Sequence, residues 1–351
     1  MDAREDGAAA GLPALEDLRE LVRLIGGYRI SQAIYVAVEL GLADLLADEP
    51  KRADDLAQAT GMHEESLYRV LRFLAAAGVL AELPSRRFTL TQLGTALRRD
   101  IPGSPSWNAR IWLDRFQWEP WGELLHCVKT GQPAFEQRHG MRLFEYLQRN
   151  PDLSQRFDEA MNANTVRDGL ALAKSYDFSG IDTLADIGGG RGLLLASLLE
   201  AYPIMRGVLF DRPQVVAHAP SVLSAAGVSD RCTVIAGDFF EGVPPGASAY
   251  LLSHIVHDWA DQDATRILRN CRIAGGRGGT VLVFERLIEP DSASEMSVLH
   301  IDLEMMVNVG GLERTKDQFQ SVFSEAGLNL ARVIPIAGTA GHVMLEGVTM
   351  R

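Results

Sequence analysis

The hydrophobic positions change their spacing about halfway along the chain. Up to about Tyr176 they recur every three or four residues, as in Leu15, Leu18 and Val22, which is the period of an amphipathic helix. From Gly180 onward, short apolar runs alternate with helical segments, as in a sheet of buried strands joined by helices. The pattern therefore predicts a helical first half followed by an α/β second half.

A helix–turn–helix with a hairpin is predicted in the first half. Residues 53–59 and 64–76 have helical spacing and are separated by a tight turn at 60–62. Two short strands, 78–80 and 88–91, follow the second helix. This order of elements predicts a winged helix-turn-helix.

The second half contains the strands of the predicted parallel sheet. We expect them at 183–187, 207–210, 232–235, 249–252 and 280–284, with an edge pair at 332–336 and 342–346. A helix is predicted over 193–202. The helix-rich segment 296–309 interrupts the alternation, and we expect it to cover a pocket.

Charge disfavours two classes of partner. The 351 residues contain 34 Lys and Arg against 46 Asp and Glu, a net charge of −12. Nucleic acid and anionic membranes bind basic faces, so we expect neither as a partner. No apolar stretch reaches the ~18 residues of a membrane span, and the N-terminus lacks the pattern of a signal peptide. We therefore expect a cytoplasmic protein.

The cysteines predict neither cross-links nor a metal centre. Cys127, Cys232 and Cys271 are sparse and odd in number, and none forms a CxxC pair. That spacing offers no disulfide framework and no zinc signature. We expect reduced thiols and no bound metal.

A glycine motif between a strand and a helix is the strongest sign of a ligand site. The sequence DIGGGRG occupies 186–192, so that Asp186 precedes Gly188 and Gly190. Glycines at this position let the backbone approach a ligand and direct N–H groups toward it. A dinucleotide fold spaces its glycines as GxGxxG, whereas these fall as GxGxG.

Two further acids follow the next strands. Asp211 ends the second strand, where a carboxylate can bind both ribose hydroxyls of a nucleoside. Asp238 follows the third strand and can bind an adenine amino group, with Phe239 against the ring. An acid-led glycine loop with two such acids favours S-adenosylmethionine, a nucleoside with an amino-acid arm, over a dinucleotide.

A histidine just beyond the fourth strand is the candidate base. Methyl transfer to a hydroxyl needs an acceptor held near the methyl carbon and a base for its proton. His257 lies where such a base is required, and its ordinary pKa is near neutral; His254 is a rival. Glu285, expected to close the fifth strand, and Glu313 are alternative carboxylates for orienting the imidazole.

These motifs together resemble a known family. The chain is similar, from about Gly27 to Val348, to the small-molecule O-methyltransferases that include plant caffeic acid and flavonoid enzymes and bacterial antibiotic- and phenazine-pathway enzymes. The shared motifs are DIGGGRG, FDRP at 210–213, GDFF at 237–240, HDWAD at 257–261 and GGLERT at 310–315. The resemblance implies an α/β fold, with a Rossmann-like class I methyltransferase domain and an all-α winged-helix N-terminal dimerisation domain.

The resemblance also assigns roles to residues. It implies that His257 is the general base, flanked by Glu285 and Glu313. It implies cofactor contacts from Gly188, Asp211, Asp238, Phe239 and Ser253, a position where plant members commonly carry a lysine. Met161, Asp258 and Asn308 match positions that line the acceptor pocket.

Aromatic residues of the helical region complete the expected pocket. Trp112 and Phe116, with Trp107 and Trp118 nearby, offer the flat faces that suit an aromatic acceptor, and packing in a helical core is the alternative interpretation. We divide the chain into a winged-helix dimerisation domain at 12–100, a helical linker at 101–178 that contributes to the acceptor pocket, and a catalytic domain at 179–351. The resemblance implies a homodimer, and whether the partner subunit also covers part of the site is left open.

The predicted function is O-methylation of a small aromatic natural product, such as a phenol, a phenazine or a polyketide, in antibiotic or other secondary metabolism. S-adenosylmethionine is the expected methyl donor and S-adenosylhomocysteine the product. Three alternatives remain: methylation of nitrogen, a non-methylating homologue that hydroxylates or decarboxylates a polyketide, and a winged-helix DNA-binding regulator. Glu64 and Glu65 begin the would-be recognition helix and would repel DNA, which disfavours the regulator.

Overall fold

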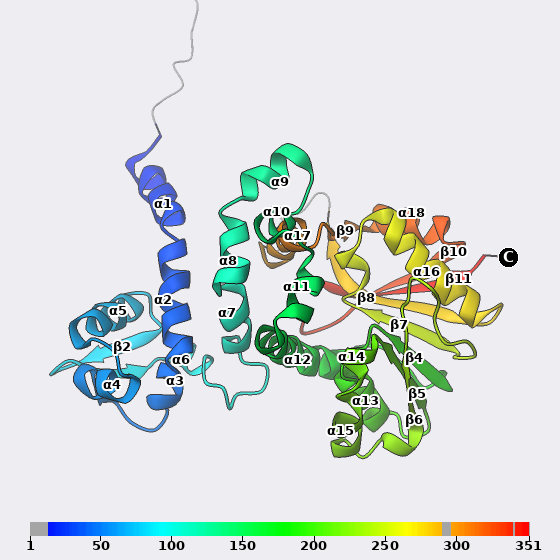
Figure 1. Ribbon diagram of the computed structural model, residues 1–351, viewed down its shortest axis with the longest axis horizontal. Helices are drawn as coiled ribbons and strands as arrows, with labels where there is room; N and C mark the ends of the chain where they lie inside the picture. The colour runs from blue at the N-terminus through cyan, green and yellow to red at the C-terminus, as the bar shows by residue number, and fades with distance from the viewer. Residues whose placement is uncertain (1–12, 290–295, 340, 351) are drawn as a thin grey trace, which may run out of the picture. The chain divides into compact units, whose positions relative to one another are not determined.

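The computed structural model describes residues 13–289, 296–339 and 341–350. The chain forms two compact units, Met1–Asp114 and Arg115–Arg351. Figure 1 shows the elements of both units along the chain. No helix among the described residues combines the length and apolar character needed to cross a bilayer.

The first unit is helical with one small sheet. Its helices are α1 (Leu15–Ile25), α2 (Tyr28–Glu39), α3 (Leu42–Leu45), α4 (Ala53–Thr60), α5 (Glu64–Ala76), α6 (Gln92–Thr95) and α7 (Ser106–Trp112). Its strands are β1 (Lys51–Arg52), β2 (Leu80–Leu83) and β3 (Arg87–Leu90), in the order β1-β3-β2. The predicted helix–turn–helix and hairpin are present, but the first hairpin strand is Leu80–Leu83 and not 78–80. The two-residue β1 was missed because so short a strand has no periodicity.

Apolar side chains of α4, α5 and the hairpin form the core of this unit. Leu56, Leu71, Leu74 and Phe88 are fully buried. Gly61 ends α4 at φ +69°, in the left-handed region, and lets the chain turn into α5. The apolar spacing of the two helices therefore predicted both elements, and these buried side chains hold them against the hairpin.

Helix α1 differs, because none of its residues is buried. Its apolar side chains are between 48% and 66% exposed in the single chain: Leu15, Leu18, Leu21, Val22, Leu24 and Ile25. The predicted amphipathic helix is formed, and its apolar stripe is left uncovered. A stripe of this size is typical of a surface that meets a partner.

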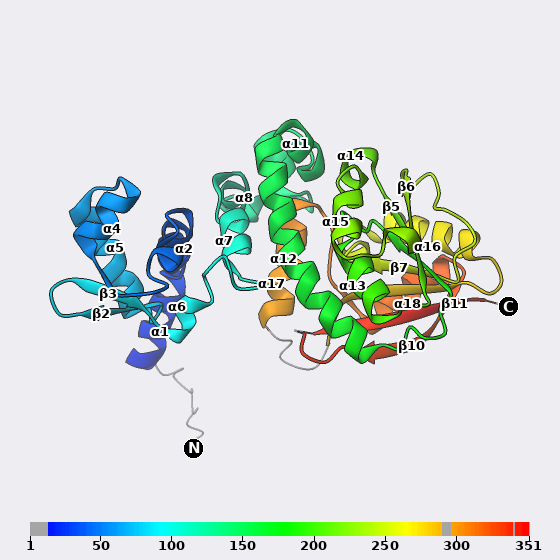
Figure 2. The same ribbon diagram turned by 90° about the horizontal axis from the view of Figure 1, so that it is seen from below.

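The second unit begins with a helical segment. It consists of α8 (Arg115–Trp121), α9 (Leu124–Thr130), α10 (Ala134–His139), α11 (Leu143–Arg149) and the long α12 (Pro151–Ser175). Helix α12 lies along α13 (Leu193–Ala201) of the α/β part, as Figure 2 shows. Helix α17 (Met296–Asn308) packs against α8, α10 and strand β8. The helical segment and the sheet are therefore parts of one unit.

A mixed sheet forms the centre of the second unit. The strands are β4 (Thr183–Ile187), β5 (Arg206–Asp211), β6 (Cys232–Ala236), β7 (Ala249–Ser253), β8 (Thr280–Ile288), β9 (Arg314–Thr315), β10 (Leu328–Pro335) and β11 (His342–Thr349). Their order is β10-β11-β8-β7-β4-β5-β6, with β9 paired to β8. Strands β4 to β8 pair in parallel, and β11 pairs antiparallel with β8 and with β10. The order reverses beside β4, where open sheets of this class bind ligands.

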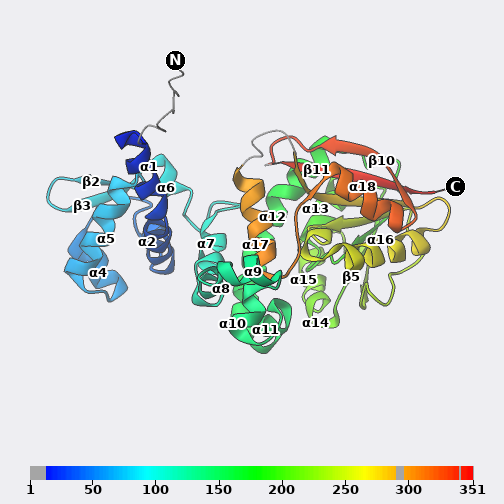
Figure 3. The same ribbon diagram turned by 90° about the horizontal axis from the view of Figure 1, so that it is seen from above.

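Helices cover both faces of the sheet, because the strand residues that point to each face are apolar. On one face, α12, α13 and α15 (Ala219–Ala225) bury residues such as Leu184, Leu251 and Leu282. On the other face, α16 (Asp261–Gly275) and α18 (Lys316–Glu325) bury Tyr250 and Val283. Figure 3 shows α16 and α18 over the sheet. The short α14 (Pro213–Val216) follows β5.

Strand β8 is longer than the sequence predicts, and this corrects the place of Glu285. We expected Glu285 to close the strand, but β8 continues to Ile288. It does so because β11 pairs with it as far as Arg286, which lies opposite His342, and β9 pairs with its last two residues, Leu287 and Ile288. Glu285 thus lies inside a central strand with an exposed fraction of 0%.

Candidate active site

A single 3-10 turn, Val256–Asp258, places the predicted base just after β7. The Nδ1 atom of His257 lies 2.8 Å from Oε1 of Glu313. The backbone N–H groups of Val256 and His257 donate to Oε1 of Glu285, at 2.9 and 3.2 Å. Its Oε2 lies 3.4 Å from Nδ1 of His257. Glu313 therefore orients the ring and Glu285 fixes the turn, so both predicted carboxylates reach His257.

The segment Gly310–Thr315 holds Glu313 in place. The Leu312 N–H donates to the carbonyl oxygen of His257 (2.9 Å), and the Glu313 N–H donates to Oδ1 of Asp302 (2.9 Å). Gly311 is required here, because a Cβ would overlap that same carbonyl oxygen. The fully buried Arg314 donates to the carbonyl oxygen of Val256 on the turn (3.0 Å) and to that of Trp259 just after it (2.8 Å).

The electrostatics of the turn favour a strong base. Burial by itself disfavours the charged imidazole, but the carboxylates of Glu285 and Glu313 outweigh it and raise the pKa of His257 to about 10. Although burial acts to raise the pKa of Glu313, its pairing with His257 holds that pKa below the ordinary value. Burial raises the pKa of Asp258, beside Nε2 of His257 at 3.6 Å, to about 6. Since a carboxylate accepts at Nδ1, the Nε2 atom is the one left to take a proton.

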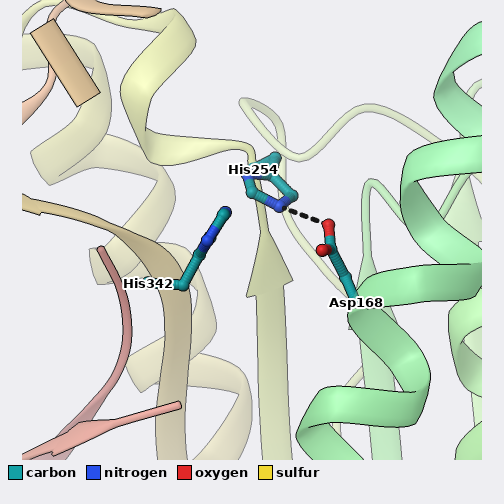
Figure 4. Close-up of side chains that lie close together, drawn as sticks. All are labelled: Asp168, His254 and His342. Carbon is teal, nitrogen blue, oxygen red and sulfur yellow. Dashed lines mark hydrogen bonds and ion pairs between the residues drawn. The ribbon is translucent and has the colours of Figure 1, made fainter. Parts of the chain in front are cut away.

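The rival histidine, His254, occupies a different position. It has a φ of +54°, rare for a residue with a side chain, and its Nε2 lies 3.1 Å from Oδ2 of Asp168 (Figure 4). His342 lies across from it with the ring centroids 5.1 Å apart. One side-chain nitrogen or oxygen atom from each of Asp168, His254 and His342 lies within 4.8 Å of the corresponding atoms of the other two. The expectation that no metal binds came from spacing along the chain, which does not show this grouping, and it stays a prediction.

The glycine loop and Asp211 form one structure at the carboxyl edge of the sheet. Gly188 and Gly190 adopt φ values of +71° and +62°. The Gly190 N–H donates to Oδ2 of Asp211 (2.9 Å), and the Arg212 N–H donates to its Oδ1 (2.6 Å). A Cβ on Gly189 would lie 2.5 Å from the Asp186 carboxylate. The loop after β4 and the acid after β5 therefore meet, as predicted.

Asp186 bears on whether these residues suit S-adenosylmethionine. It is 1% exposed, and neither carboxylate oxygen has a hydrogen-bond partner among the described residues. Burial, and secondarily the charge of Asp211, raises the pKa of Asp186 to about 7. A buried carboxylate without a donor is costly, and a ligand ammonium group would satisfy it. The glycine loop and this acid thus fit the amino-acid arm of that cofactor.

Phe239, predicted to lie against the adenine ring, belongs to a small aromatic cluster. Asp238 is exposed beyond β6 and accepts from the Phe240 N–H (2.8 Å). Phe239 packs edge-on against Phe240 and Trp259. Asn270 donates to the Phe239 carbonyl oxygen (2.7 Å). The sequence predicted Asp238 and Phe239 as contacts for adenine. The hydrogen bond from Asn270, on α16, to the backbone of Phe239 is visible only in the fold.

The residues predicted to bind the acceptor are distributed over several elements. Met161 lies on α12 and is half-buried, Asp258 ends the 3-10 turn, and Asn308 ends α17 with an exposed fraction of 2%. Ser253, predicted for the cofactor, ends β7 and is half-buried.

Asn308 is connected to a buried acid that sequence analysis missed. Its Nδ2 donates to Oε1 of Glu304 (2.7 Å), and Trp121 Nε1 donates to Oε2 of the same carboxyl group (3.0 Å). Burial raises the pKa of Glu304 to about 7. Its place one helical turn before Asn308 was the only signal in the sequence.

The predicted aromatic lining has a different environment. Phe116 is 4% exposed and stacks on Tyr146 with centroids 6.0 Å apart, in a cluster with Phe135 and His139. Phe116 therefore has the alternative role considered for it, packing in a helical core, and not that of an exposed pocket lining. Trp112 ends α7 in the first unit.

The strand order, the glycine loop joined to Asp211 and the histidine turn after β7 define a Rossmann-like class I S-adenosylmethionine-dependent methyltransferase. Comparison with known proteins identifies the family within this class. Residues 121–329 match the O-methyltransferase domain family, and residues 22–100 match the O-methyltransferase dimerisation domain. The chain belongs to this family of O-methyltransferases, which act on small natural products, and its dimerisation domain implies a homodimer.

Individual relatives agree over nearly the whole length. The chain is 41% identical over 317 residues to the phenazine O-methyltransferase PhzM of Lysobacter antibioticus, covering 90% of this chain and 92% of that protein. It is 39% identical over 331 residues to the mitomycin biosynthesis 6-O-methyltransferase of Streptomyces lavendulae, covering 94% and 93%. The structure of the mitomycin 7-O-methyltransferase MmcR superposes with a TM-score of 0.90 at 37% identity, over 95% of this chain and 98% of that one.

Structures of relatives also contain the cofactor. NcsB1 from neocarzinostatin biosynthesis, 33% identical with a TM-score of 0.78 over 91% of this chain and 96% of that one, was solved with S-adenosylmethionine and 2-hydroxy-5-methyl naphthoic acid. Relatives of other chemistry also match, among them an N,N-dimethyltransferase acting on 8-amino-8-demethylriboflavin (36% identical) and the aclacinomycin 10-hydroxylase RdmB (34%).

Proposed function

We propose that this protein transfers the methyl group of S-adenosylmethionine to a hydroxyl of a small aromatic natural product, with His257 as general base. The observation that carries the proposal is the contact of His257 Nδ1 with Glu313 at 2.8 Å, above a turn that Glu285 fixes. A buried imidazole between two carboxylates is suited to receive a proton, because the carboxylates stabilise the imidazolium that forms. This arrangement therefore favours an enzyme over a protein that only binds its ligand.

His257 takes the proton of the acceptor hydroxyl at Nε2. The imidazolium that results is stabilised by Glu313 and Glu285, which remain ionised. Because the raised pKa of about 10 is close to the ~10 of a phenol, proton transfer between the two groups is nearly balanced. The hydroxyl oxygen thereby gains the electron density that a displacement at carbon requires.

Different residues of the chain would hold the different parts of the cofactor. Asp186 and the loop at Gly188 and Gly190 would hold the amino-acid arm, and Asp211 the ribose. Asp238 and Phe239 would hold the adenine, with Ser253 at the edge of the site. When bound, the sulfonium supplies an electrophilic methyl group. These residues fix its position relative to the acceptor, which is the larger part of catalysis in such a displacement.

We propose that Met161, Asp258 and Asn308 contact the acceptor. Trp112 and Phe116 stay predictions for the same pocket, with Phe116 disfavoured by its packing. We keep the division into 12–100, 101–178 and 179–351, in which the middle segment contributes to the acceptor site. Absence of a metal from the reaction is likewise a prediction.

Two alternative reactions have relatives of their own. A nitrogen acceptor, as in the riboflavin-type dimethyltransferase, does not need a base of high pKa. A homologue that hydroxylates its substrate, as the aclacinomycin 10-hydroxylase RdmB does, does not need a base that takes a phenolic proton. The intact set of His257, Glu285 and Glu313 therefore favours O-methylation.

The test is product analysis with a defined acceptor panel. The panel contains 3-amino-4-hydroxybenzoate, 1,4-dihydroxy-2-naphthoic acid, a hydroxyphenazine and a hydroxyanthracycline, and mass spectrometry detects the products formed by wild type and by His257→Ala. We expect a product heavier by one methyl on oxygen, reduced about 100-fold or more in the variant. Methylation of nitrogen, an oxygenated product, or undiminished turnover in the variant would contradict the proposal.

A further inference from the structure

Glu304, on α17, is an acid that the proposed reaction gives no role. Trp121 Nε1, at the end of α8, donates to its Oε2 (3.0 Å), and Asn308 Nδ2 donates to its Oε1 (2.7 Å). The Trp121 ring is itself packed edge-on against His300 of α17, with the centroids 6.4 Å apart. Each oxygen of the carboxyl group therefore has one donor, from α8 on one side and from its own helix on the other.

The chemistry of these three side chains fixes the direction of the Asn308 amide. The indole N–H of Trp121 can only donate a hydrogen bond, and an ionised carboxylate can only accept. Burial raises the pKa of Glu304 to about 7, so the carboxylate is the main form above neutral pH. Both of its oxygens then need donors. The nitrogen of the Asn308 amide must face Glu304, and the amide oxygen must point away from it.

That amide oxygen is buried without a donor from the protein. Asn308 is 2% exposed, and its Oδ1 has no hydrogen-bond partner among the residues that the structure describes. Buried polar atoms are nearly always paired, and an unpaired one destabilises the state in which it occurs. An N–H or O–H group of a ligand would supply the donor that is lacking.

The proposed base lies within reach of the same region. Asn308 precedes Gly311 by three residues, and Gly311 lies against the carbonyl oxygen of His257. Three residues of chain span at most about 11 Å. That length is comparable with an acceptor of two or three fused rings. One molecule can therefore present a hydroxyl to His257 and a second polar group to Asn308.

We propose that Glu304 holds the Asn308 amide with its oxygen toward the acceptor, so that the site selects acceptors with a second hydrogen-bond donor, a hydroxyl or an amino group, besides the hydroxyl that is methylated. The inference rests on the proposed function and on the proposed contact of Asn308 with the acceptor. Glu304 is a positioning residue, because it acts through Asn308 and does not meet the acceptor. An ether oxygen in place of the second donor would face the amide oxygen and disfavour binding.

Replacement of Glu304 by glutamine should reverse this preference. In Glu304→Gln the new amide group has one oxygen and one NH2 group. Trp121 can only donate, so the new oxygen must face Trp121 and the new NH2 group must face Asn308. The Asn308 amide then turns its oxygen toward position 304 and its nitrogen toward the acceptor. The variant should prefer a substituent that only accepts, where wild type prefers one that donates.

The test compares matched acceptors at pH 8.5, where Glu304 is ionised. The acceptor that is methylated best is paired with its analogue in which the remaining hydroxyl or amino group is replaced by methoxy. For 3-amino-4-hydroxybenzoate this analogue is 4-hydroxy-3-methoxybenzoate. We expect wild type to favour the donor-bearing compound about tenfold or more in kcat/KM, and Glu304→Gln to favour the methoxy analogue. A best acceptor without a second donor, or an unchanged preference in Glu304→Gln, would overturn the proposal.

Two further variants separate orientation from structural damage. Adding Trp121→Phe to Glu304→Gln removes the donor that fixes the new amide, and this should remove the reversal. Asn308→Leu should abolish the preference in both directions. A structural defect would lower the turnover of both compounds alike, and a second substitution would not correct it. A preference that persists in Asn308→Leu would show that another residue selects the acceptor.

The orientation can also be observed without an acceptor. Protein labelled with 15N at asparagine and saturated with S-adenosylhomocysteine is studied by NMR at pH 8.5, and Asn308→Leu identifies the signal by its loss. One side-chain N–H of Asn308 should have the low-field proton shift of a hydrogen bond to a carboxylate, and should lose it in Glu304→Gln. Absence of this shift from wild type would refute the orientation. If the shift is present but no acceptor is methylated on oxygen, the proposed function fails and the acceptor selection with it, while the contact of Glu304 with Asn308 is confirmed.

Discussion

The backbone N–H of Leu312 donates to the carbonyl oxygen of His257 at 2.9 Å, across 55 positions of the chain. This bond joins the segment that carries Glu313 to the turn that carries the base. It forms because Gly311 has no side chain, since a Cβ there would overlap the same carbonyl oxygen. The distance between base and orienting carboxylate therefore depends on a residue that touches neither side chain.

Replacement of Gly311 tests this dependence. Gly311→Ala should force the two segments apart, destabilise the protein by about 1–3 kcal/mol as overpacking does, and lower kcat about tenfold or more with cofactor affinity retained. Thermal unfolding and titration calorimetry with S-adenosylhomocysteine measure these effects. Gly278→Ala is the control, because a Cβ there meets nothing within 4 Å. Similar effects in both variants would show that the close approach is unimportant.

Removal of the charge on Glu313 should change the pH profile. Glu313 raises the pKa of His257, so Glu313→Gln lowers that pKa and the neutral base becomes available at lower pH. For an acceptor with a pKa above 9, kcat/KM of wild type should rise about tenfold per pH unit between pH 7 and 9. In the variant the rise should end at lower pH, with a reduced plateau because the ring loses its orienting partner. A limb that stays in place would contradict the assigned cause.

Binding and chemistry should separate between Asp211 and His257. Asp211 closes the glycine loop through Gly190 and Arg212, so Asp211→Asn should weaken S-adenosylhomocysteine by about 1.5–3 kcal/mol, the value of hydrogen bonds to a charged group. His257→Ala should leave that affinity within a factor of two while turnover is lost. Calorimetry on both proteins decides. Equal loss of affinity would refute the division of roles.

The buried Asp186 predicts a pH dependence of cofactor affinity. Its pKa is about 7 in the protein without cofactor, and a ligand ammonium group binds the ionised form. Below pH 7 the carboxyl group must first lose a proton, so affinity should fall by up to tenfold per pH unit, whereas above pH 7 it should be constant. Affinity measured from pH 6 to 8 shows the change, and Asp186→Asn should bind weakly and without this dependence. A flat profile in wild type would contradict it.

The uncovered stripe of α1 predicts part of the dimer interface. Val22 and Ile25 are each 66% exposed in the single chain. Val22→Glu with Ile25→Glu should shift the protein from dimer to monomer in light scattering, because two buried charges per subunit oppose association. Arg19→Glu, in the same helix, is the matched control for added acid. A double variant that stays dimeric would place the interface elsewhere.

Local patterns in the sequence determined much of this fold. Apolar spacing predicted the winged helix-turn-helix and every long strand of the sheet, since period and turn chemistry are properties of neighbouring residues. The glycine motif predicted a tight loop, and Asp211 was correctly expected at the end of β5. The position of His257 after β7 also follows from local sequence, because the strand and the turn are consecutive.

Only the tertiary structure decided how distant segments meet. Glu313 reaches His257 across 56 positions, and Asp168 reaches His254 across 86. Glu285 lies inside β8 because pairing with β11 and then with β9 extends that strand, which no property of the strand's own residues indicates. Helix α1 has the spacing of a buried face and remains exposed. In each case the outcome depends on which surfaces pack together, and hydrophobic period specifies a face without specifying its partner.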